Sequence, residues 1–390
     1  MTPHCLNNSP KHSLHRPAKS IVPAMCCKRQ QVHYGSASWL LDIKEDTEIM
    51  LDELIKEAAN RRDVFKKLGA AGLGAALMAN AGFDPAMAQE LKKASKPLKA
   101  AFSNAGLQAT WCAQGKQAAE AWGTLMNVEI SWFDGELSAT KQRSSIDNMA
   151  SQKWDFVAIQ PFGIGTLVDP VKKMIDSGTP VIAMDTLIAP PGTINIHTQI
   201  SPDNVFMGSV VTNQIMAAIK GEGNVVMTQG ALGHSGAQGR AKGFKQVLAA
   251  YPNVKLINEE PADWDVTKVA RIWESILTQN ENIAAAFFHN DDMALAAHNV
   301  MKAKNRTGII IGGVDAMPPA VNAVLEGVML ATVRNPSCRI HGWSVAAGVA
   351  AVVGGEKSPK DIPAYILADG PVITTETAPG HLWLQKNFLI

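Results

Sequence analysis

The chain has 390 residues, of which 46% are hydrophobic and 18% charged, and its formal net charge at pH 7 is +1. A chain of this length and ordinary composition can form about two globular domains. The near-neutral charge, with no lysine- and arginine-rich stripe in the body of the chain, argues against nucleic acid as a partner.

The first part of the chain does not look like a folded domain. Residues 1–49 are rich in Pro, His, Ser and Lys and show no sustained hydrophobic period, so we expect residues 1–59 to be a disordered extension. Met50 is a candidate for the true start of translation, because the export signal described next would then lie near the N-terminus.

Residues 60–88 have the organisation of an export signal. Arg61 and Arg62 precede sixteen residues without a charge, 68–83, and the Ala86-Met87-Ala88 triplet offers a cleavage site. The arginine pair is typical of twin-arginine signals. A membrane anchor is the alternative, but a stretch this short and rich in Gly and Ala spans a bilayer poorly. We therefore expect cleavage after about Ala88 and a periplasmic mature protein.

Two cysteines, Cys112 and Cys338, remain after that cleavage. Their separation excludes a CxxC redox or zinc pattern. An oxidising periplasm permits a disulfide between them, whereas two inert buried thiols are the alternative.

Short apolar runs alternate with amphipathic stretches from residue 98 onward. The predicted strands are 99–103, 128–133, 155–160, 180–185, 224–229, 254–260, 284–289, 308–314 and 329–334. The predicted helices between them are 112–126, 138–152, 166–177, 236–250, 265–279, 291–304 and 317–326. This alternation predicts an α/β fold with two doubly wound lobes, each a parallel sheet with helices on both faces. Ligands of such sheets bind at the carboxyl ends of the strands.

Polar and aromatic side chains gather at these predicted strand ends. They are Asn104, Gln108, Trp111, Gln160, Asp185, Arg240, Trp264, Asn290 and Asp315. Neighbouring hydroxyls of a polyhydroxylated ligand are well bound by planar Asp, Asn and Arg groups, and aromatic rings pack on its C–H faces. The set therefore favours a sugar-like ligand.

Enzymatic alternatives find less support. The run "GALGHSGAQG" spaces its glycines as G-x-x-G and lacks both the G-x-G turn of dinucleotide loops and a G-K-[ST] element, so no nucleotide cofactor is expected. It also misses the G-x-S-x-G spacing of hydrolases, and no HExxH or Cys/His metal cluster occurs. Asp291 and Asp292 are better explained as caps of a helix beginning near Met293. We expect no catalysis, cofactor or metal, and an exported enzyme acting on polyols stays a minor alternative.

Between about Lys99 and Lys357 the chain resembles the periplasmic sugar-binding proteins of ABC importers, of the ribose-binding type. The resemblance rests on "SPDNVFMG" (201–208), "QGALGHSGAQGRAKGF" (229–244), "PADWD" (261–265), "FFHNDDMAL" (287–295), "GGVDAMP" (312–318) and "GVMLATVRNP" (327–336). It implies a type I periplasmic binding protein, in which a three-strand hinge joins two lobes that close over the ligand. The crossings would lie near Ser201, Asn335 and residue 364. The N-terminal lobe would then be 89–201 plus 336–364, and the C-terminal lobe 202–335 plus 365–390.

Carried over residue by residue, the resemblance implies a specific binding site. Its ligand contacts would be Trp111, Asp185, Arg240, Trp264, Asn290, Asp315 and Asn335. Asn104, Gln108, Gln160 and Thr186 are weaker candidates. The glycines of the 230–239 run would form a tight loop and close helix–strand packing, while Arg240 would face the cleft.

Three departures from the ribose-binding pattern bear on the ligand. Thr186 stands where the family has an arginine that grips the sugar ring, Ala109 where an asparagine is expected, and Cys112 where a second aromatic is expected. Fewer ring-gripping groups favour a smaller or acyclic ligand, such as a C4–C6 sugar alcohol, over a ring pentose or hexose. The implied partners are that ligand and the membrane permease of an importer, with the protein a monomer. A sensing adaptor for a chemoreceptor is the alternative.

Overall fold

A computed structural model describes residues 94–354 and 362–388, all within one compact unit, Ala70–Ile390. The proposed N-terminal extension, signal peptide and cleavage site lie outside the described residues. Within the described ranges, no helix has the length and apolar character needed to cross a membrane.

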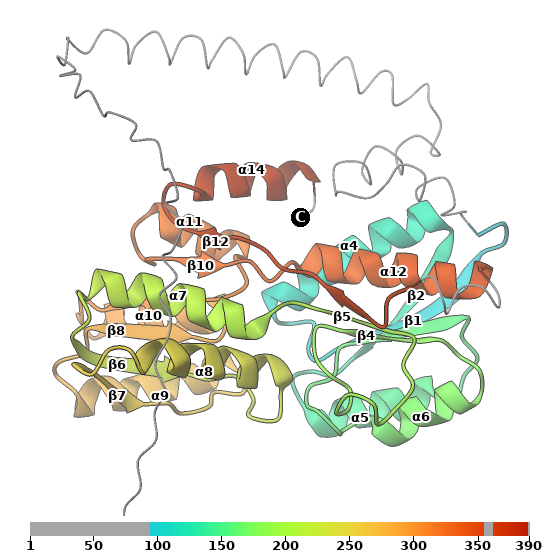
Figure 1. Cartoon of the computed structure of the whole chain (residues 1–390), viewed down its shortest axis with the longest axis horizontal. Coiled ribbons are helices and arrows are strands. Elements are labelled where there is room, and N and C mark those ends of the chain that lie inside the picture. Colours follow the sequence, from blue (N-terminus) through green and yellow to red (C-terminus); the bar gives the residue numbers. More distant parts are fainter. Residues whose placement is uncertain (1–93, 355–361, 389–390) are drawn as a thin grey trace, which may run out of the picture. The chain divides into compact units, whose positions relative to one another are not determined.

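The first lobe is built on a six-stranded sheet in which every paired strand is parallel (Figure 1). Its strands, in spatial order, are β11 (Tyr365–Leu367), β5 (Thr198–Ser201), β4 (Val181–Met184), β3 (Phe156–Ile159), β1 (Leu98–Asn104) and β2 (Val128–Asp134). Helices α4 (Thr110–Met126) and α12 (Ser337–Val353) cover one face, and α5 (Ala139–Met149) and α6 (Val168–Asp176) the other.

Successive side chains of these strands belong alternately to two apolar layers, because side chains along a strand point to opposite faces of the sheet. Phe156 and Ala158 of β3 pack with α4 and α12, whereas Val157 and Ile159 pack with α5 and α6. Both faces of the sheet are therefore buried, and its strands are continuous apolar runs.

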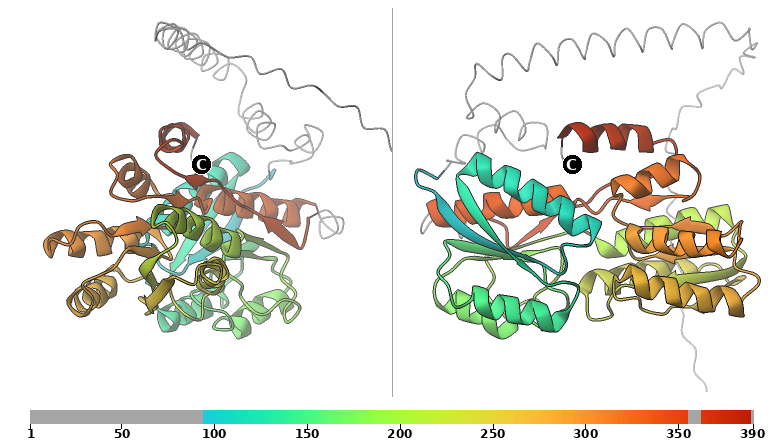
Figure 2. Two further views of the ribbon diagram at one scale, coloured as in Figure 1. Left: turned by 60° about the vertical axis from the view of Figure 1, so that its left-hand side comes forward. Right: turned by 180° about the vertical axis from the view of Figure 1, so that it is seen from behind.

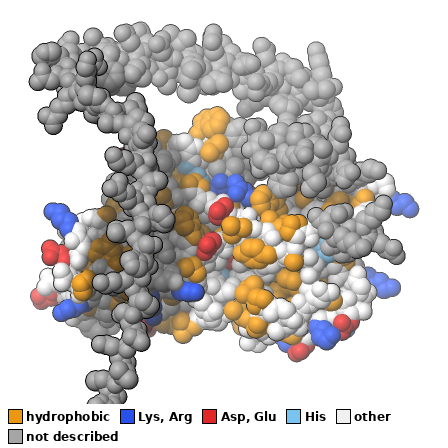
Figure 3. All heavy atoms as spheres, in the orientation of Figure 1, with side chains coloured by type: hydrophobic (Ala, Val, Ile, Leu, Met, Phe, Trp, Pro, Cys, Tyr) orange, Lys and Arg blue, Asp and Glu red, His pale blue; other side chains and the backbone are white. Residues whose placement is uncertain are grey.

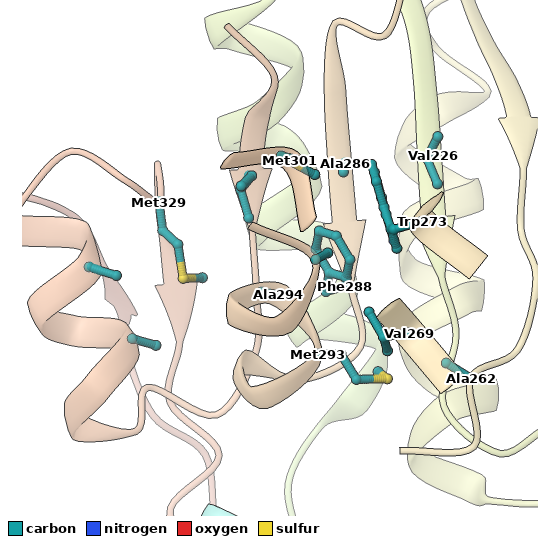
Figure 4. Packing of buried hydrophobic residues seen from close by; sticks show 14 of the residues in the cluster. Val226, Ala262, Val269, Trp273, Ala286, Phe288, Met293, Ala294, Met301 and Met329 are labelled. Carbon is teal, nitrogen blue, oxygen red and sulfur yellow. The ribbon is translucent and has the colours of Figure 1, made fainter. Parts of the chain in front are cut away.

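The second lobe repeats this architecture with four parallel strands. Their spatial order is β7 (Val254–Asn258), β6 (Gly223–Thr228), β8 (Ala285–Phe288) and β9 (Ile310–Gly312). Helices α7 (Asn204–Ala218) and α8 (Ser235–Leu248) lie on one face, with α9 (Val266–Gln279) and α10 (Asp291–Ala303) on the other (Figure 2). Figure 4 shows the second layer, where Trp273 of α9 and Phe288 of β8 pack at a ring-centroid distance of 5.3 Å.

Three segments connect the lobes, as expected, but one of them lies later than predicted. The chain crosses between β5 and α7, and again between β10 (Thr332–Val333) and α12. The third crossing was expected near residue 364. It follows Leu367 instead, because β11 still pairs with β5 of the first sheet. Only then does β12 (Val372–Ile373) pair antiparallel with β10, before α14 (Ala378–Phe388) packs on α11 (Pro318–Leu325).

Three helices, α7, α12 and α14, were not predicted, because the apolar residues of each do not form a single pronounced stripe. α12 is buried on most sides and rich in Gly and Ala, so it lacks the amphipathic period that indicates a surface helix. Its small residues permit close contact, since a Cβ at Gly348 would lie 2.1 Å from the Phe156 ring.

Of the glycines in the 230–239 run, Gly239 allows close packing of two helices, whereas Gly233 has no neighbour within 4 Å of the place of a Cβ. A Cβ at Gly239 would lie 2.6 Å from Cβ of Asn204, and further along α8 a Cβ at Gly243 would lie 2.1 Å from the carbonyl oxygen of Val205. Both contacts are made with α7.

Cys112 and Cys338 are both free and buried. Burial raises the pKa of the Cys338 thiol to about 11 and that of Cys112 still further. Of the two alternatives, the structure has two buried thiols rather than a disulfide.

Candidate functional site

A cavity lies between the two lobes and is lined by residues of both. Its lining residues are Ala105, Ala109, Trp111, Cys112, Leu137, Gln160, Asp185, His234, Arg240, Trp264, Asn290, Asp315 and Asn335. All seven principal candidates from the sequence are among them. Each of the seven side chains is buried, so the described structure is a closed form.

The topology explains why residues so distant in sequence meet. Gln160 and Asp185 directly follow β3 and β4 of the first lobe, and Asn290 and Asp315 follow β8 and β9 of the second. The carboxyl ends of both parallel sheets therefore line the cavity. Asn335 lies on the second crossing segment, between β10 and α12.

Four cavity residues have left-handed backbone conformations that residues other than glycine rarely adopt. The φ angles are 53° at Leu137, 56° at Asp185, 66° at Trp264 and 115° at Asp315. Such conformations cost on the order of 1–3 kcal/mol each and concentrate at functional sites. In Asp185 the strained backbone is held by hydrogen bonds to Ile200 and from Ser201 of β5.

Arg240 is fixed by contacts from three directions. Its Nε donates to Oδ1 of Asn204 at 3.0 Å, its Nη1 to the carbonyl oxygen of His289, and its Nη2 to Oδ1 of Asp315 at 3.3 Å. The guanidinium carbon also lies 5.7 Å from the centre of the Trp264 ring, a cation–π distance. The arginine is therefore held rigidly before any ligand arrives.

In the second lobe, burial shifts the pKa of an acidic and of a basic side chain in opposite directions. It raises the pKa of Asp315 to about 7, against the lowering effect of Arg240. It lowers the pKa of His289 well below its ordinary value, and nearby Arg240 lowers that pKa further. The charge at the second-lobe side of the cavity is consequently small apart from Arg240 itself.

Asp185 is bound from two other segments. Its Oδ1 accepts from Nδ2 of Asn335 at 3.1 Å, and its Oδ2 accepts from Oγ1 of Thr186 at 2.9 Å. Gln160 Nε2 lies 3.5 Å from the same Oδ2. The carboxylate thus has a fixed orientation, and its remaining lone pairs can accept hydrogen bonds from a ligand.

The two tryptophans come from opposite lobes and differ in their polar contacts. Nε1 of Trp111 donates to the carbonyl oxygen of Asn335 at 3.1 Å, and its ring packs 5.0 Å from that of His341. Trp264 lies against Gly230, where a Cβ would approach the indole to 2.1 Å. Nε1 of Trp264 is buried without a hydrogen-bond partner, as is Oδ1 of Asn335. Both residues line the cavity.

Of the weaker candidates, only Gln160 lines the cavity. Asn104 is fully buried behind it, with Nδ2 donating to the carbonyl oxygen of Cys112 at 3.3 Å and Oδ1 at 3.1 Å from Nε2 of His341. Gln108 is exposed, because α4 begins only at Thr110 and leaves it in the preceding turn. Thr186 is buried beside Asp185 and does not line the cavity.

The expected capping role of Asp291 and Asp292 also needs correction. Asn290 is the N-cap of α10, its Oδ1 accepting from the backbone N–H of Met293 at 2.9 Å. Asp291 instead accepts from Thr332 and Met317, and Asp292 contacts the other lobe. Asn290 therefore combines a capping oxygen with a place at the cavity.

His234 lines the cavity but was not predicted. The signal that could have indicated His234 is its position, because it lies in the loop after the carboxyl end of β6. Burial lowers its pKa to about 4, with Asp185 and Arg240 acting in opposite directions. Among residues 94–354 and 362–388, no group of three or more His, Cys, Asp or Glu side chains is placed so that it could hold a metal ion.

These features define a two-lobed binding protein with a closed central site. Residues 100–357 match the model of the periplasmic binding protein domain, and the chain belongs to this family.

Several relatives of known name cover most of the same region. The xylitol-binding protein of Mycolicibacterium smegmatis is 29% identical over 268 residues, which are 67% of this chain and 73% of that protein. The ribose import binding protein RbsB of Salmonella typhimurium is 27% identical over 219 residues, 56% of this chain and 72% of that protein. A crystal structure of a galactofuranose binding protein superposes with a TM-score of 0.69 at 26% identity, covering 75% of this chain and all of the other.

Proposed function

We propose that this protein captures one small, uncharged polyhydroxylated molecule, a sugar or sugar alcohol, between its lobes and delivers it to the membrane permease of an ABC importer. The observation that carries the proposal is the composition of the buried cavity. Carboxylates, a guanidinium and amides surround it together with two indoles, and Trp264 Nε1 and Asn335 Oδ1 have no partner. A ligand with several hydroxyls can both donate to and accept from such groups.

The charges of the cavity favour a neutral ligand. Arg240 opposes a cationic ligand, while Asp185 and Asp315 oppose an anionic one. Because Arg240 already donates to Asp315 and to two other residues, it is balanced within the protein. A negative charge on the ligand would therefore be buried without a free counter-ion, which is costly.

Within that class we favour a C4–C6 sugar alcohol or a pentose. Thr186 and Cys112 are small residues at positions where the resemblance led us to expect larger ring-binding groups, and Ala109 adds no amide to the lining. The name of the xylitol-binding relative agrees with this preference. We further propose that residues 60–88 export the chain by the twin-arginine route and that it works as a periplasmic monomer.

Delivery to an importer is favoured over a sensing role, because the named relatives include an import binding protein. Binding without chemical conversion is the proposed activity. On the face drawn in Figure 3, acidic and basic side chains are interspersed, as suits a partner other than nucleic acid.

A thermal-shift panel tests the ligand class. Protein purified from the periplasm of expressing cells is mixed with pentoses, hexoses and C4–C6 sugar alcohols. A ligand at about a hundred times its dissociation constant stabilises the native state by about 2.7 kcal/mol. A clear rise of Tm with one or a few of these compounds is expected, and no rise with any would refute the proposed class. N-terminal sequencing of the same protein tests cleavage after about Ala88.

A further inference from the structure

His234 makes two hydrogen bonds that together fix where its proton lies. It is the N-cap of α8, and its Nδ1 accepts the backbone N–H of Gly236 at 3.0 Å. An imidazole nitrogen that accepts a hydrogen bond carries no proton. In the neutral ring the proton must therefore be on Nε2, and burial keeps this ring neutral, with a pKa of about 4.

Nε2 of His234 lies 2.6 Å from the hydroxyl oxygen of Thr186, which belongs to the opposite lobe. Since Nε2 carries the proton, the histidine donates and the threonine oxygen accepts. The single hydrogen of the Thr186 hydroxyl is then free to be donated, and Oδ2 of Asp185 lies 2.9 Å away to accept it.

These contacts form a hydrogen-bond chain with one direction, from Gly236 through His234 and Thr186 to Asp185. The chain crosses the cleft between His234 and Thr186, so it can be complete only when the lobes are closed. Its end point is a carboxylate that lines the cavity, and Asn335 of the crossing segment fixes the other oxygen of that carboxylate.

Other contacts close to His234 join the lobes and restrict the position of its ring. The Leu187 N–H donates to Oγ of Ser235 at 3.0 Å, and the Ile164 N–H donates to the carbonyl oxygen of Gly233 at 2.8 Å. The ring of Trp264 meets the imidazole edge to face, at a centroid distance of 5.0 Å. The residues before and after His234, Gly233 and Ser235, are therefore bonded to the opposite lobe, and the imidazole itself packs against Trp264.

We propose that His234 is a positioning residue of the binding site, which orients Asp185 for the ligand through Thr186 and does so only in the closed form. The inference rests on the proposed function. The Thr186 hydroxyl satisfies one lone pair of Asp185 and holds the carboxylate plane, so that the remaining lone pairs accept from ligand hydroxyls. Ligand selection and lobe closure are thereby coupled through one side chain.

The test combines affinity measurements with a spectroscopic signature. Binding of the best compound from the thermal-shift panel is measured by calorimetry for H234A, T186V, the double variant and T186S. H234A and T186V are each expected to weaken binding about tenfold, the effect of losing one hydrogen bond. The double variant should be no weaker than the weaker single variant, because both changes break the same chain. T186S keeps the hydroxyl and should restore most of the affinity.

T212V is the matched control, since Thr212 is an equally buried threonine whose hydroxyl bonds to Gly208 within α7. It should bind like the unmodified protein. In ¹⁵N-histidine NMR of the liganded protein, His234 should show the neutral tautomer with the proton on Nε2.

An Nδ1-protonated or charged His234 ring would overturn the inference, as would additive losses in the double variant or unchanged affinity in T186V. If H234A does not fold, the inference is still tested by the affinities of T186V and T186S and by the His234 tautomer, because none of these measurements requires the H234A variant. If the unmodified protein binds no compound in the panel, the proposed function fails; if it binds and the variants bind equally, only this inference fails.

Discussion

The carboxylate of Asp292 caps a helix of the opposite lobe by accepting hydrogen bonds from the backbone N–H and the hydroxyl of Thr110. Its Oδ2 accepts the Thr110 N–H at 2.9 Å and its Oδ1 accepts the Thr110 hydroxyl at 2.6 Å. Thr110 is the first residue of α4, whose own N-cap residue, Ala109, makes no side-chain capping bond. A negative charge at this end of a helix is also favoured by its dipole. Closure of the lobes therefore supplies α4 with the cap that its sequence lacks.

Loss of this cap should weaken the closed state without changing ligand preference. Loss of an N-cap costs about 0.5–2 kcal/mol, so D292A should raise Kd by a factor between about 2 and 30. The factor should be nearly the same for every ligand. Calorimetric titrations with two different ligands measure this. D265A is the control, because Asp265 caps α9 within a single lobe. It should lower Tm and leave Kd unchanged. A large change of preference in D292A would contradict the capping account.

Arg240 should be essential for binding, and its neighbour on the same helix should not. R240A removes a buried cation and leaves Asp315 unpaired, a loss of about 3–5 kcal/mol in comparable buried pairs. We expect undetectable binding and a lower Tm. Lys245 of α8 pairs with Glu259 at 2.6 Å, but both side chains are about half exposed, so K245A should bind normally. Full affinity in a folded R240A variant would remove the arginine from the site.

Alanine substitutions at two glycines of the same loop, Gly230 and Gly233, distinguish displacement of Trp264 from a general disturbance of the loop. G230A places a methyl group where the indole now lies, so Trp264 must move and affinity should fall at least about tenfold, the loss of one good aromatic contact. G233A meets nothing within 4 Å and should be neutral in binding and in Tm. Equal affinities of the two variants would show that the position of Trp264 is unimportant.

The raised pKa of Asp315 predicts a pH-dependent stability difference between the unmodified protein and D315N. The folded pKa is about 7, whereas the unfolded value is 3.8. As pH falls through 7, the folded protein takes up a proton while the unfolded chain stays ionised. The unmodified protein should therefore gain stability relative to D315N by up to about 1.4 kcal/mol per pH unit between pH 7 and 4. Urea unfolding of both unliganded proteins at pH 5 and pH 8 measures this, and a constant difference would contradict it.

The seven principal cavity residues could be predicted because their positions follow from the fold. Asp185 and Asp315 end or follow apolar strands, and parallel sheets gather such residues at one edge. Asn335 needed the resemblance to a family in addition, although it directly follows the predicted strand 329–334.

What the sequence did not reveal depends on contacts between the lobes. The bond between His234 and Thr186 joins residues 48 positions apart, and the one between Asp292 and Thr110 joins residues 182 apart. No periodicity or local motif encodes such pairs. α12 escaped prediction for a different reason, because a helix buried on most sides has no polar face to give it a period.

Whether the cavity holds a polyhydroxylated ligand is decided by calorimetric titration of the unmodified protein with a C5 sugar alcohol and with ribose. We predict saturable binding of one molecule per chain for at least one of these compounds, with the sugar alcohol bound more tightly than ribose. Tighter binding of ribose would contradict the preference drawn from Thr186 and Cys112 and would leave the ligand class in place. Absence of binding for every sugar alcohol, pentose and hexose would contradict the account itself.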